Sequence, residues 1–284
     1  MKLYEEYQKF ICDHQMFCFN HQTETIKYRF FGNGQQVILV LLGSSVFPTE
    51  AYFKILIELE KTNKILTVEY PKTIKTVKEL THIIFLLITH LNIDKLNILG
   101  ASHGGGIAQA IAKNHPNHVN KLILYNTLTK TKQMNPSSTE VIEHVLEAIE
   151  QLSELRKMMP LETIKSALLD QIKDVIQDEE TVDLFEHIIA LYQEKDEKIQ
   201  MGLIKNFLTH YIFESKDFKY LSDKIMVLYS NDDDPFGGAE LIETLADLFT
   251  SPRLEFIEAD RFSLILDSKE FSIKINQFIQ EKSI

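Results

Sequence analysis

The stretch ILGASHGGGIAQAIA (Ile98–Ala112) decides the fold, because an apolar run enters a glycine-rich turn and leaves it in small residues. This order predicts a buried strand, a sharp turn at Gly100–Gly106 and then a helix. Two kinds of site use such a turn. In one, glycines let the backbone approach a pyrophosphate at the helix N-terminus. In the other, the turn presents a nucleophilic serine, which here is Ser102.

The segment GASHGGG has the glycine spacing G-x-x-x-G-x-G of the phosphate-binding turn in short-chain dehydrogenases. That turn normally follows the first strand of its fold, whereas buried-strand patterns at 35–43 and 64–71 precede this one. The next predicted strand ends in ILYNT and offers no acidic residue for a ribose hydroxyl. Both features oppose a dinucleotide site.

The pentapeptide Gly100-Ala101-Ser102-His103-Gly104 also fits G-x-S-x-G, the pattern of a nucleophile elbow. In that turn the residues two before and two after the serine approach each other, so both must be small. We therefore predict Ser102 as a nucleophile, in a strained backbone conformation at the carboxyl end of a central strand. The alternative is a tight turn whose serine has no chemical role.

The elements around this turn alternate between strand and helix, which predicts a mostly parallel, doubly wound α/β sheet. From about 136 to 213 only helical periodicity is found, and strand patterns then resume at 223–234 and 253–259. We therefore expect an α/β core formed by 1–135 and 214–284, with an all-helical cap inserted at 136–213. The cap is expected to cover the carboxyl ends of the strands and to line a largely hydrophobic pocket there.

Composition excludes several classes of function. The chain has 284 residues, a net charge of −11 and no long basic run, so binding to nucleic acid or to an anionic membrane surface is not expected. No segment approaches ~20 unbroken apolar residues, so no membrane span is expected. The charged start MKLYEEYQKF predicts a cytoplasmic protein. Cys12 and Cys18 are the only cysteines, and we expect two semi-buried thiols without a disulfide.

On these elements the sequence resembles the α/β-hydrolase family over nearly its whole length. The resemblance implies that the LLGSSVF loop (41–47) supplies half of an oxyanion hole, with the backbone N–H groups of Ser44 and His103 as the donors. It places Asp234, in the segment VLYSNDDDPF, at the position of the catalytic acid. The ring of His103 is expected to be structural or to line the pocket. The resemblance implies neither a cofactor nor a metal.

The chain departs from the family pattern at the base. In the segment EADRFSLILDSKEF (258–271), Arg261 occupies the place of the family's histidine, and no histidine follows His210. A permanently protonated guanidinium cannot accept the serine proton, so we expect Arg261 to pair with Asp234 instead. His210, where the chain returns from cap to core, is the best candidate for a displaced base. The alternative for His210 is a hinge residue without a catalytic role.

The segments between Leu41 and Thr127 are similar to the maspardin-like branch of this fold. That branch keeps the serine elbow, departs from the family at the histidine and is regarded as partner-binding. Two hypotheses therefore remain open. The chain is a serine hydrolase of a small carboxylic ester or related acyl compound, bound in the cap-covered pocket, or it is an inactive hydrolase-fold scaffold that binds a protein partner.

Overall fold

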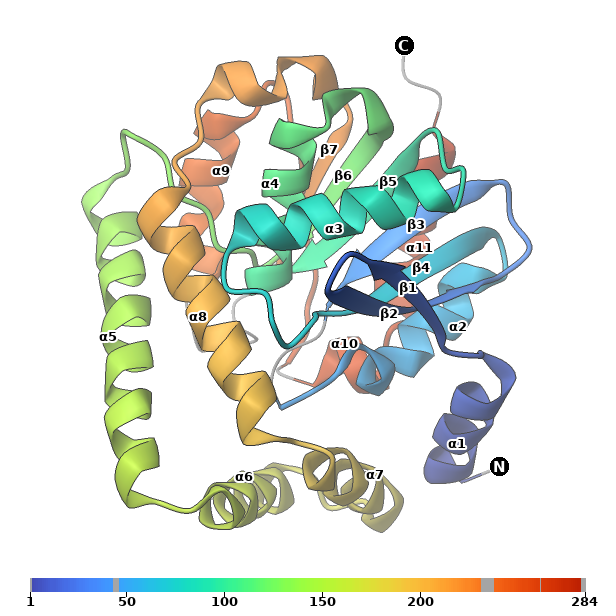
Figure 1. The fold of residues 1–284 in the computed structure, drawn as a ribbon, viewed down its shortest axis with the longest axis vertical. Helices are drawn as coiled ribbons and strands as arrows, with labels where there is room; N and C mark the ends of the chain where they lie inside the picture. The colour runs from blue at the N-terminus through green and yellow to red at the C-terminus, as the bar shows by residue number, and fades with distance from the viewer. Residues whose placement is uncertain (1, 43–45, 231–237, 261, 282–284) are drawn as a thin grey trace.

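The computed structural model describes residues 2–42, 46–230, 238–260 and 262–281. Within them the strands form an eight-stranded sheet in the order β1-β2-β4-β3-β5-β6-β7-β8 (Figure 1). The strands are β1 (Phe17–His21), β2 (Glu24–Phe31), β3 (Gln36–Leu41), β4 (Asn63–Glu69), β5 (Leu96–Ala101), β6 (Val119–Tyr125), β7 (Ile225–Tyr229) and β8 (Arg253–Phe256). Neighbouring strands from β4 through β8 run parallel, whereas β1 and β2 form an antiparallel hairpin that adds to β4.

Helices cover both faces of the sheet, so its central strands are buried on both sides; every residue of β5 is buried. One face carries α3 (Val77–His90), α4 (His103–Asn114), α9 (Ile242–Leu248) and the 3₁₀ helices η2 (Pro116–His118), η3 (Ser215–Leu221) and η4 (Gly238–Leu241). The other carries α1 (Leu3–Asp13), η1 (Thr49–Tyr52), α2 (Phe53–Glu60), α10 (Ser263–Leu266) and α11 (Lys269–Gln280). The predicted fold class, a mostly parallel α/β sheet with flanking helices, is confirmed.

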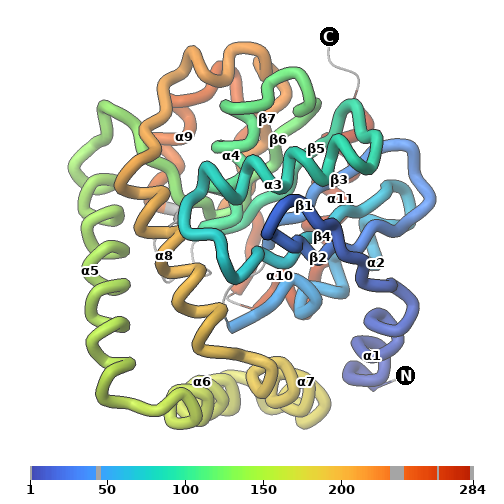
Figure 2. Tube along the Cα trace, viewed as in Figure 1, coloured from blue at the N-terminus to red at the C-terminus, as the bar shows by residue number. Residues whose placement is uncertain are grey.

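Four long helices connect β6 to β7: α5 (Pro136–Met158), α6 (Leu161–Val175), α7 (Glu179–Ala190) and α8 (Glu194–His210). Helix α5 begins where the Asn135 side chain accepts the Ser138 N–H at 2.7 Å and Pro136 fixes the first turn. Helix α8 packs on α3 and α4, while α7 packs on the amino-terminal helix α1. Figure 2 shows α6 and α7 at the same end of the molecule as α1.

The two cysteines differ from expectation. Cys12 and Cys18 are both exposed, not semi-buried. Helix α1 buries Tyr7 and Phe10, and Cys12 lies two positions beyond Phe10, which turns it roughly to the opposite face of the helix. Cys18 belongs to β1, the edge strand of the sheet, where one neighbour is missing.

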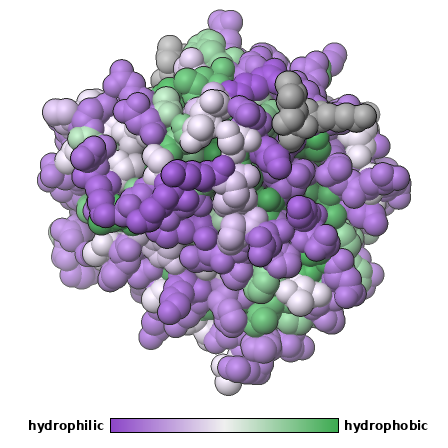
Figure 3. Space-filling view, turned by 90° about the horizontal axis from the view of Figure 1, so that it is seen from above, coloured by the Kyte–Doolittle hydropathy of each residue, from purple (hydrophilic) through white to green (hydrophobic). Residues whose placement is uncertain are grey.

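The surface is dominated by hydrophilic residues. In the view of Figure 3, apolar residues appear between them only in small groups. Among the helices in the described part of the chain, none has both the length and the apolar character needed to cross a membrane.

A buried ion pair holds the helices between β6 and β7 together. The Arg156 guanidinium donates through Nε to Glu197 Oε2 at 2.7 Å, and the two side chains are 8% and 5% exposed. Arg156 also donates through Nη1 to the Met159 carbonyl at 3.0 Å, and the Tyr192 hydroxyl donates to the other Glu197 oxygen. Removing one partner would leave the other charge buried without compensation.

We therefore expect Glu197→Gln to lower the free energy of unfolding by about 2–3 kcal/mol, because a neutral amide leaves the buried Arg156 cation uncompensated. Chemical denaturation measures the change. The control is Glu154→Gln, whose partner Lys157 and own side chain are exposed, and which should leave the midpoint unchanged. Equal midpoints for the two variants would contradict a structural role for the buried pair.

Candidate active site

Ser102 lies in the turn between β5 and α4, at the carboxyl end of a central strand. Its backbone angles are φ 48° and ψ −122°, a region that residues other than glycine rarely adopt. The Ser102 N–H donates to the Tyr125 carbonyl at 3.0 Å. Its carbonyl accepts from the N–H groups of Gly105 at 3.1 Å and Leu128 at 3.2 Å. These bonds from both neighbouring elements hold the backbone in the strained conformation.

Close approach of α4 to the sheet explains the glycines of the turn. A Cβ on Gly104 would lie 1.9 Å from the Leu41 carbonyl oxygen, and one on Gly100 would lie 2.7 Å from the Gly104 oxygen. A Cβ on Gly105 would lie 1.7 Å from Thr127 Oγ1. The strained Ser102 and the close approach at Gly100 and Gly104 agree with the geometry that G-x-S-x-G predicts.

Substitution of Gly104 should therefore disrupt the elbow. We expect Gly104→Ala to reduce the yield of folded protein or to lower the melting temperature strongly, because the new methyl group would overlap backbone of β3. The matched control is Gly202→Ala in α8, where no atom lies within 4 Å of the added Cβ. That variant should be more stable by about 0.5–1 kcal/mol, since alanine is the better helix former. Thermal unfolding of both variants tests the contrast, and a well-tolerated Gly104→Ala would contradict the close approach.

Only the His103 half of the predicted oxyanion hole lies in the described residues. His103 is the first residue of α4, and N–H groups in a first turn have no partner within the helix. They carry the positive end of the helix dipole, which suits a developing negative charge. Strand β3 pairs Leu41 with Gly100, so the loop that contains Ser44 leaves the sheet beside the elbow. Ser44 itself is outside the described residues.

Asp234 and Arg261 are also outside the described residues. The chain is fixed just before Asp234, because the Ser230 N–H donates to Asn126 Oδ1 at 3.1 Å and Asn126 Nδ2 donates to Ser230 Oγ at 3.0 Å. Asn126 follows β6 with a positive φ of 36°, and it is buried. The segment that contains Asp234 therefore begins at the carboxyl end of β7, next to the strand that follows the elbow helix.

His210 lies on the surface at the end of α8, where its Nδ1 donates to the Asn206 carbonyl of its own helix at 3.1 Å. Two residues later, the Ile212 carbonyl accepts from Lys113, in the last turn of α4, at 3.3 Å. Ser102 precedes the first turn of the same helix, and the rise from Ser102 to Lys113 is about 16 Å. These contacts tie His210 to the end of α4 that is opposite the elbow.

The imidazole of His103 is buried without a hydrogen bond. The residue is 5% exposed, and neither ring nitrogen has a partner among the described residues. The ring meets that of Tyr70 nearly at right angles, with 6.4 Å between centroids. Burial lowers the pKa of His103 to about 4, so the ring is neutral at pH 7.

This depressed pKa predicts a loss of stability in acid. Below pH 6.5 the unfolded chain binds a proton at His103 that the folded chain does not, so stability falls as the pH drops toward 4. Between pH 7 and pH 4 the natural protein should lose on the order of 3 kcal/mol more than His103→Leu, which has no ring to protonate. Denaturant titrations across this range test the difference, with His144→Leu on the exposed face of α5 as the control. Parallel pH profiles for the natural protein and His103→Leu would contradict the burial of the ring.

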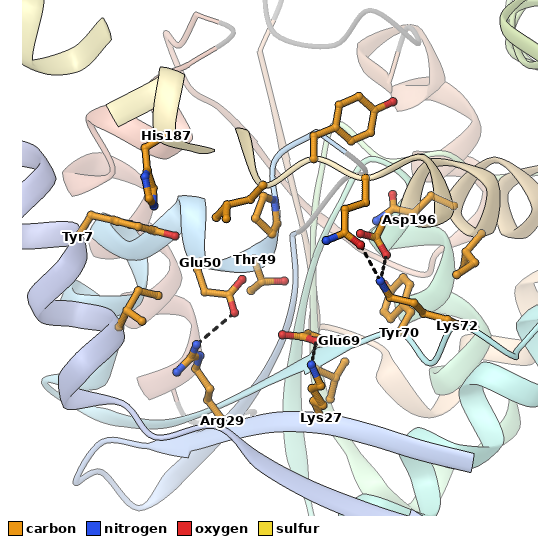
Figure 4. Close-up of a pocket in the computed structure, with 18 of the residues that line it drawn as sticks. Tyr7, Lys27, Arg29, Thr49, Glu50, Glu69, Tyr70, Lys72, His187 and Asp196 are labelled. Atoms are coloured by element: carbon orange, nitrogen blue, oxygen red, sulfur yellow. Dashed lines mark hydrogen bonds and ion pairs between the residues drawn. The ribbon is translucent and has the colours of Figure 1, made fainter. Parts of the chain in front are cut away.

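A cavity of about 810 Å³ opens at the carboxyl ends of β3 and β4. Leu41 and Tyr70 line it, and both also contact the elbow: the Leu41 carbonyl faces Gly104 and the Tyr70 ring meets His103. Figure 4 shows charged and tyrosine side chains around it. The described residues that line it are Tyr4, Tyr7, Gln8, Ile11, Cys12, Lys27, Arg29, Leu41, Pro48, Thr49, Glu50, Val68, Glu69, Tyr70, Lys72, His187, Leu191, Tyr192, Gln193, Asp196, Ile199 and Gln200.

Apolar surface predominates in this lining, but it also holds charged side chains, and the apolar faces of the cap helices contribute little to it. Those faces are used elsewhere: Val145 and Phe207 pack into the core over α3 and α4, and Leu184 and Ile188 pack into the core beneath α1 and α2. Sequence reasoning missed the charged lining. The one signal in the sequence is β2, ETIKYRFF, where Lys27 and Arg29 alternate with buried Ile26 and Tyr28.

Comparison with protein families matches residues 72–268 to a model described as alpha/beta hydrolase fold. None of the curated proteins shows significant similarity to the sequence. A carboxylesterase structure from the thaumarchaeon Nitrososphaera gargenis superposes with a TM-score of 0.72 and 19% identity, covering 93% of this chain and 97% of that one.

Two other solved structures are similar in the same way. A hydrolase from Pseudomonas aeruginosa has a TM-score of 0.67 and 16% identity, with 94% of this chain and 99% of that chain covered. The enol-lactonase from Burkholderia xenovorans has a TM-score of 0.67 and 17% identity, with 93% and 100% covered. At these identities the likeness is one of fold.

Proposed function

Because the chain belongs to the alpha/beta hydrolase fold family, we propose that it is a serine hydrolase of small carboxylic esters or related acyl compounds. The observation that carries the proposal is the strained Ser102 at the start of α4, held by hydrogen bonds from β6 and from the chain that follows it. Backbone strain of this kind persists where the surrounding structure enforces it, and it is typical of active sites.

In the proposed reaction, Ser102 Oγ attacks the carbonyl carbon of the ester, and the carbonyl oxygen becomes an oxyanion. The N–H groups of His103 and Ser44 donate to that oxygen, and the dipole of α4 favours its charge. Asp234 is proposed as the acid. The tetrahedral intermediate then breaks its bond to the alkoxide oxygen, which takes up the proton lost by Ser102 and leaves as the alcohol. Water hydrolyses the acyl–serine ester, which releases the carboxylic acid and restores the Ser102 hydroxyl.

The base is the weak part of this site, because Arg261 stands where a proton acceptor is needed. Loss of one member of a triad typically leaves a residual rate of ~10³–10⁴ over water, supplied by the oxyanion hole and by binding. We therefore propose slow turnover in the natural sequence. The names of the similar structures, a carboxylesterase and an enol-lactonase, fit chemistry at an ester carbonyl.

The alternative is a protein that has kept the fold and lost turnover, as in the maspardin-like branch. The specific observation that favours it is Arg261 in the segment EADRFSLILDSKEF. On this alternative, Asp234 and Arg261 form a structural ion pair and the cap or cavity binds a protein partner.

A fluorophosphonate probe separates the two functions. We expect covalent labelling of Ser102, detected by mass spectrometry of the digested protein, and no labelling of Ser102→Ala. We also expect Arg261→His to raise the rate of phenyl acetate hydrolysis by about 100-fold or more, since an imidazole accepts the serine proton. Folded natural protein that stays unlabelled, together with an Arg261→His variant that stays inactive, would favour the scaffold.

A further inference from the structure

Three ion pairs lie around the cavity, and each joins different segments of the chain (Figure 4). On the side of the cavity formed by the sheet, Lys27 Nζ of β2 lies 3.4 Å from Glu69 Oε2 at the end of β4. Beside it, Arg29 Nη2 lies 3.4 Å from Glu50 Oε1 of η1. Among the described lining residues, positive and negative side chains are therefore matched.

The third pair connects the sheet side of the cavity to helix α8 of the cap. Lys72, which follows β4, lies 3.1 Å from Asp196 Oδ1 and donates to Gln193 Oε1 at 3.2 Å; both partners belong to the start of α8. On the opposite side of the cavity, Tyr4 of α1 and His187 Nδ1 of α7 are 3.2 Å apart. Contacts between core and cap thus form two sides of the cavity.

These ion pairs leave hydrogen-bonding capacity that water or a ligand can use. All three are longer than the ~2.7–2.9 Å of a tight charge-assisted bond. A carboxylate has about four acceptor sites and an ammonium has three donors. Arg29 is buried, yet its Nε has no partner among the described residues, and Nη1 donates only to the His14 carbonyl. The lining of the cavity therefore presents hydrogen-bond donors and acceptors next to each other.

The geometry points to a neutral, hydroxyl-rich ligand in this cavity, such as the sugar or polyol part of an ester. A hydroxyl group accepts from a cation and donates to a carboxylate at the same time, so it inserts into an ion pair without separating the charges. A ligand with net charge would gain no net attraction from a lining in which positive and negative side chains are already matched. Tyrosine rings, each with one polar end, complete the lining; they belong to Tyr4, Tyr7, Tyr70 and Tyr192.

Size and electrostatics agree with this ligand class. A volume of about 810 Å³ lies within the range of small-molecule sites, ~300–1,000 Å³. Burial and the neighbouring Glu50 raise the pKa of Tyr7 to about 12, so its hydroxyl keeps its proton and remains a donor at pH 7. The inference rests on the proposed function in one respect. Leu41 and Tyr70 place the inner end of the cavity beside the elbow, where the ester bond would lie.

Binding is measured first, without turnover. Ser102→Ala protein is titrated by calorimetry with methyl β-D-glucopyranoside, and in parallel with succinate as a dianion and alanine as a zwitterion. We expect the glucoside to bind and the other two to bind at least about tenfold more weakly, because a charged group of either ligand must displace one member of an existing ion pair to form its own. No binding of the glucoside, or tighter binding of succinate or alanine, would overturn the inference.

Variants locate the binding site. On the Ser102→Ala background, Lys72→Met should weaken glucoside binding about tenfold, the effect of losing one charge-assisted hydrogen bond. Glu69→Gln, which keeps the shape of the side chain and leaves the contacts between core and cap intact, should weaken it in the same direction. The matched control is Lys132→Met, another exposed lysine paired with a carboxylate, Glu214, away from the cavity lining. Equal affinities for Lys72→Met, Glu69→Gln and Lys132→Met would exclude the cavity as the site.

Turnover is measured second, with protein that has the natural Ser102. The rates of release of acetate from acetylated methyl glucoside and of methanol from monomethyl succinate are compared, and the sugar ester is expected to be the better substrate. Failures remain distinguishable. Glucoside binding without fluorophosphonate labelling of Ser102 would support the cavity and oppose the hydrolase. Labelling of Ser102 with faster cleavage of monomethyl succinate would support the hydrolase and overturn the ligand class.

Discussion

The contact between α4 and β3, where Gly104 meets the Leu41 carbonyl, is the constraint on which the site depends. A Cβ at Gly104 would lie 1.9 Å from that oxygen, so the helix reaches the strand only because the side chain is absent. This approach places the amino end of α4 over the carboxyl ends of β3 and β5. Ser102, the residue before α4, has its positive-φ conformation in the same turn. The close approach of the helix and the strain of the serine thus occur together at the carboxyl end of β5.

The elbow has an uncharged side chain on one side and a cavity with charged residues nearby. With α4 so close to the sheet, the His103 ring is buried beside Tyr70, and its low pKa keeps it uncharged. Tyr70 also lines the cavity, where the lysine, arginine and carboxylate side chains of the described lining residues form pairs. In the proposed reaction, the oxyanion would form beside the amino end of α4, where the first-turn N–H groups and the helix dipole favour negative charge.

The sequence predicts the elbow well because every condition on it is local. Glycines at 100 and 104, an apolar run before them and small residues after them lie within one short segment, and the mostly parallel character of the sheet follows from alternating strands and helices. The cavity could not be predicted in this way. Its walls come from α1, β2, η1, β4, α7 and α8, and pairs such as Arg29 with Glu50 form only once β2 is placed next to β4. The β1–β2 hairpin was itself missed, because its exposed edge strand lacks a continuous apolar run.

The position of α1 has a consequence for access to the site. Tyr4 and His187 are separated by 183 positions in sequence, yet they form one wall of the cavity. Lys72 and Asp196 form the opposite wall, and their side chains are 52% and 37% exposed. Because exposed ion pairs contribute little to stability, the Lys72–Asp196 contact opens at small energetic cost, whereas the buried Arg156–Glu197 pair does not. Since Glu197 directly follows Asp196, the start of α8 is joined to the core by an exposed pair at Lys72 and to α5 by a buried pair at Arg156.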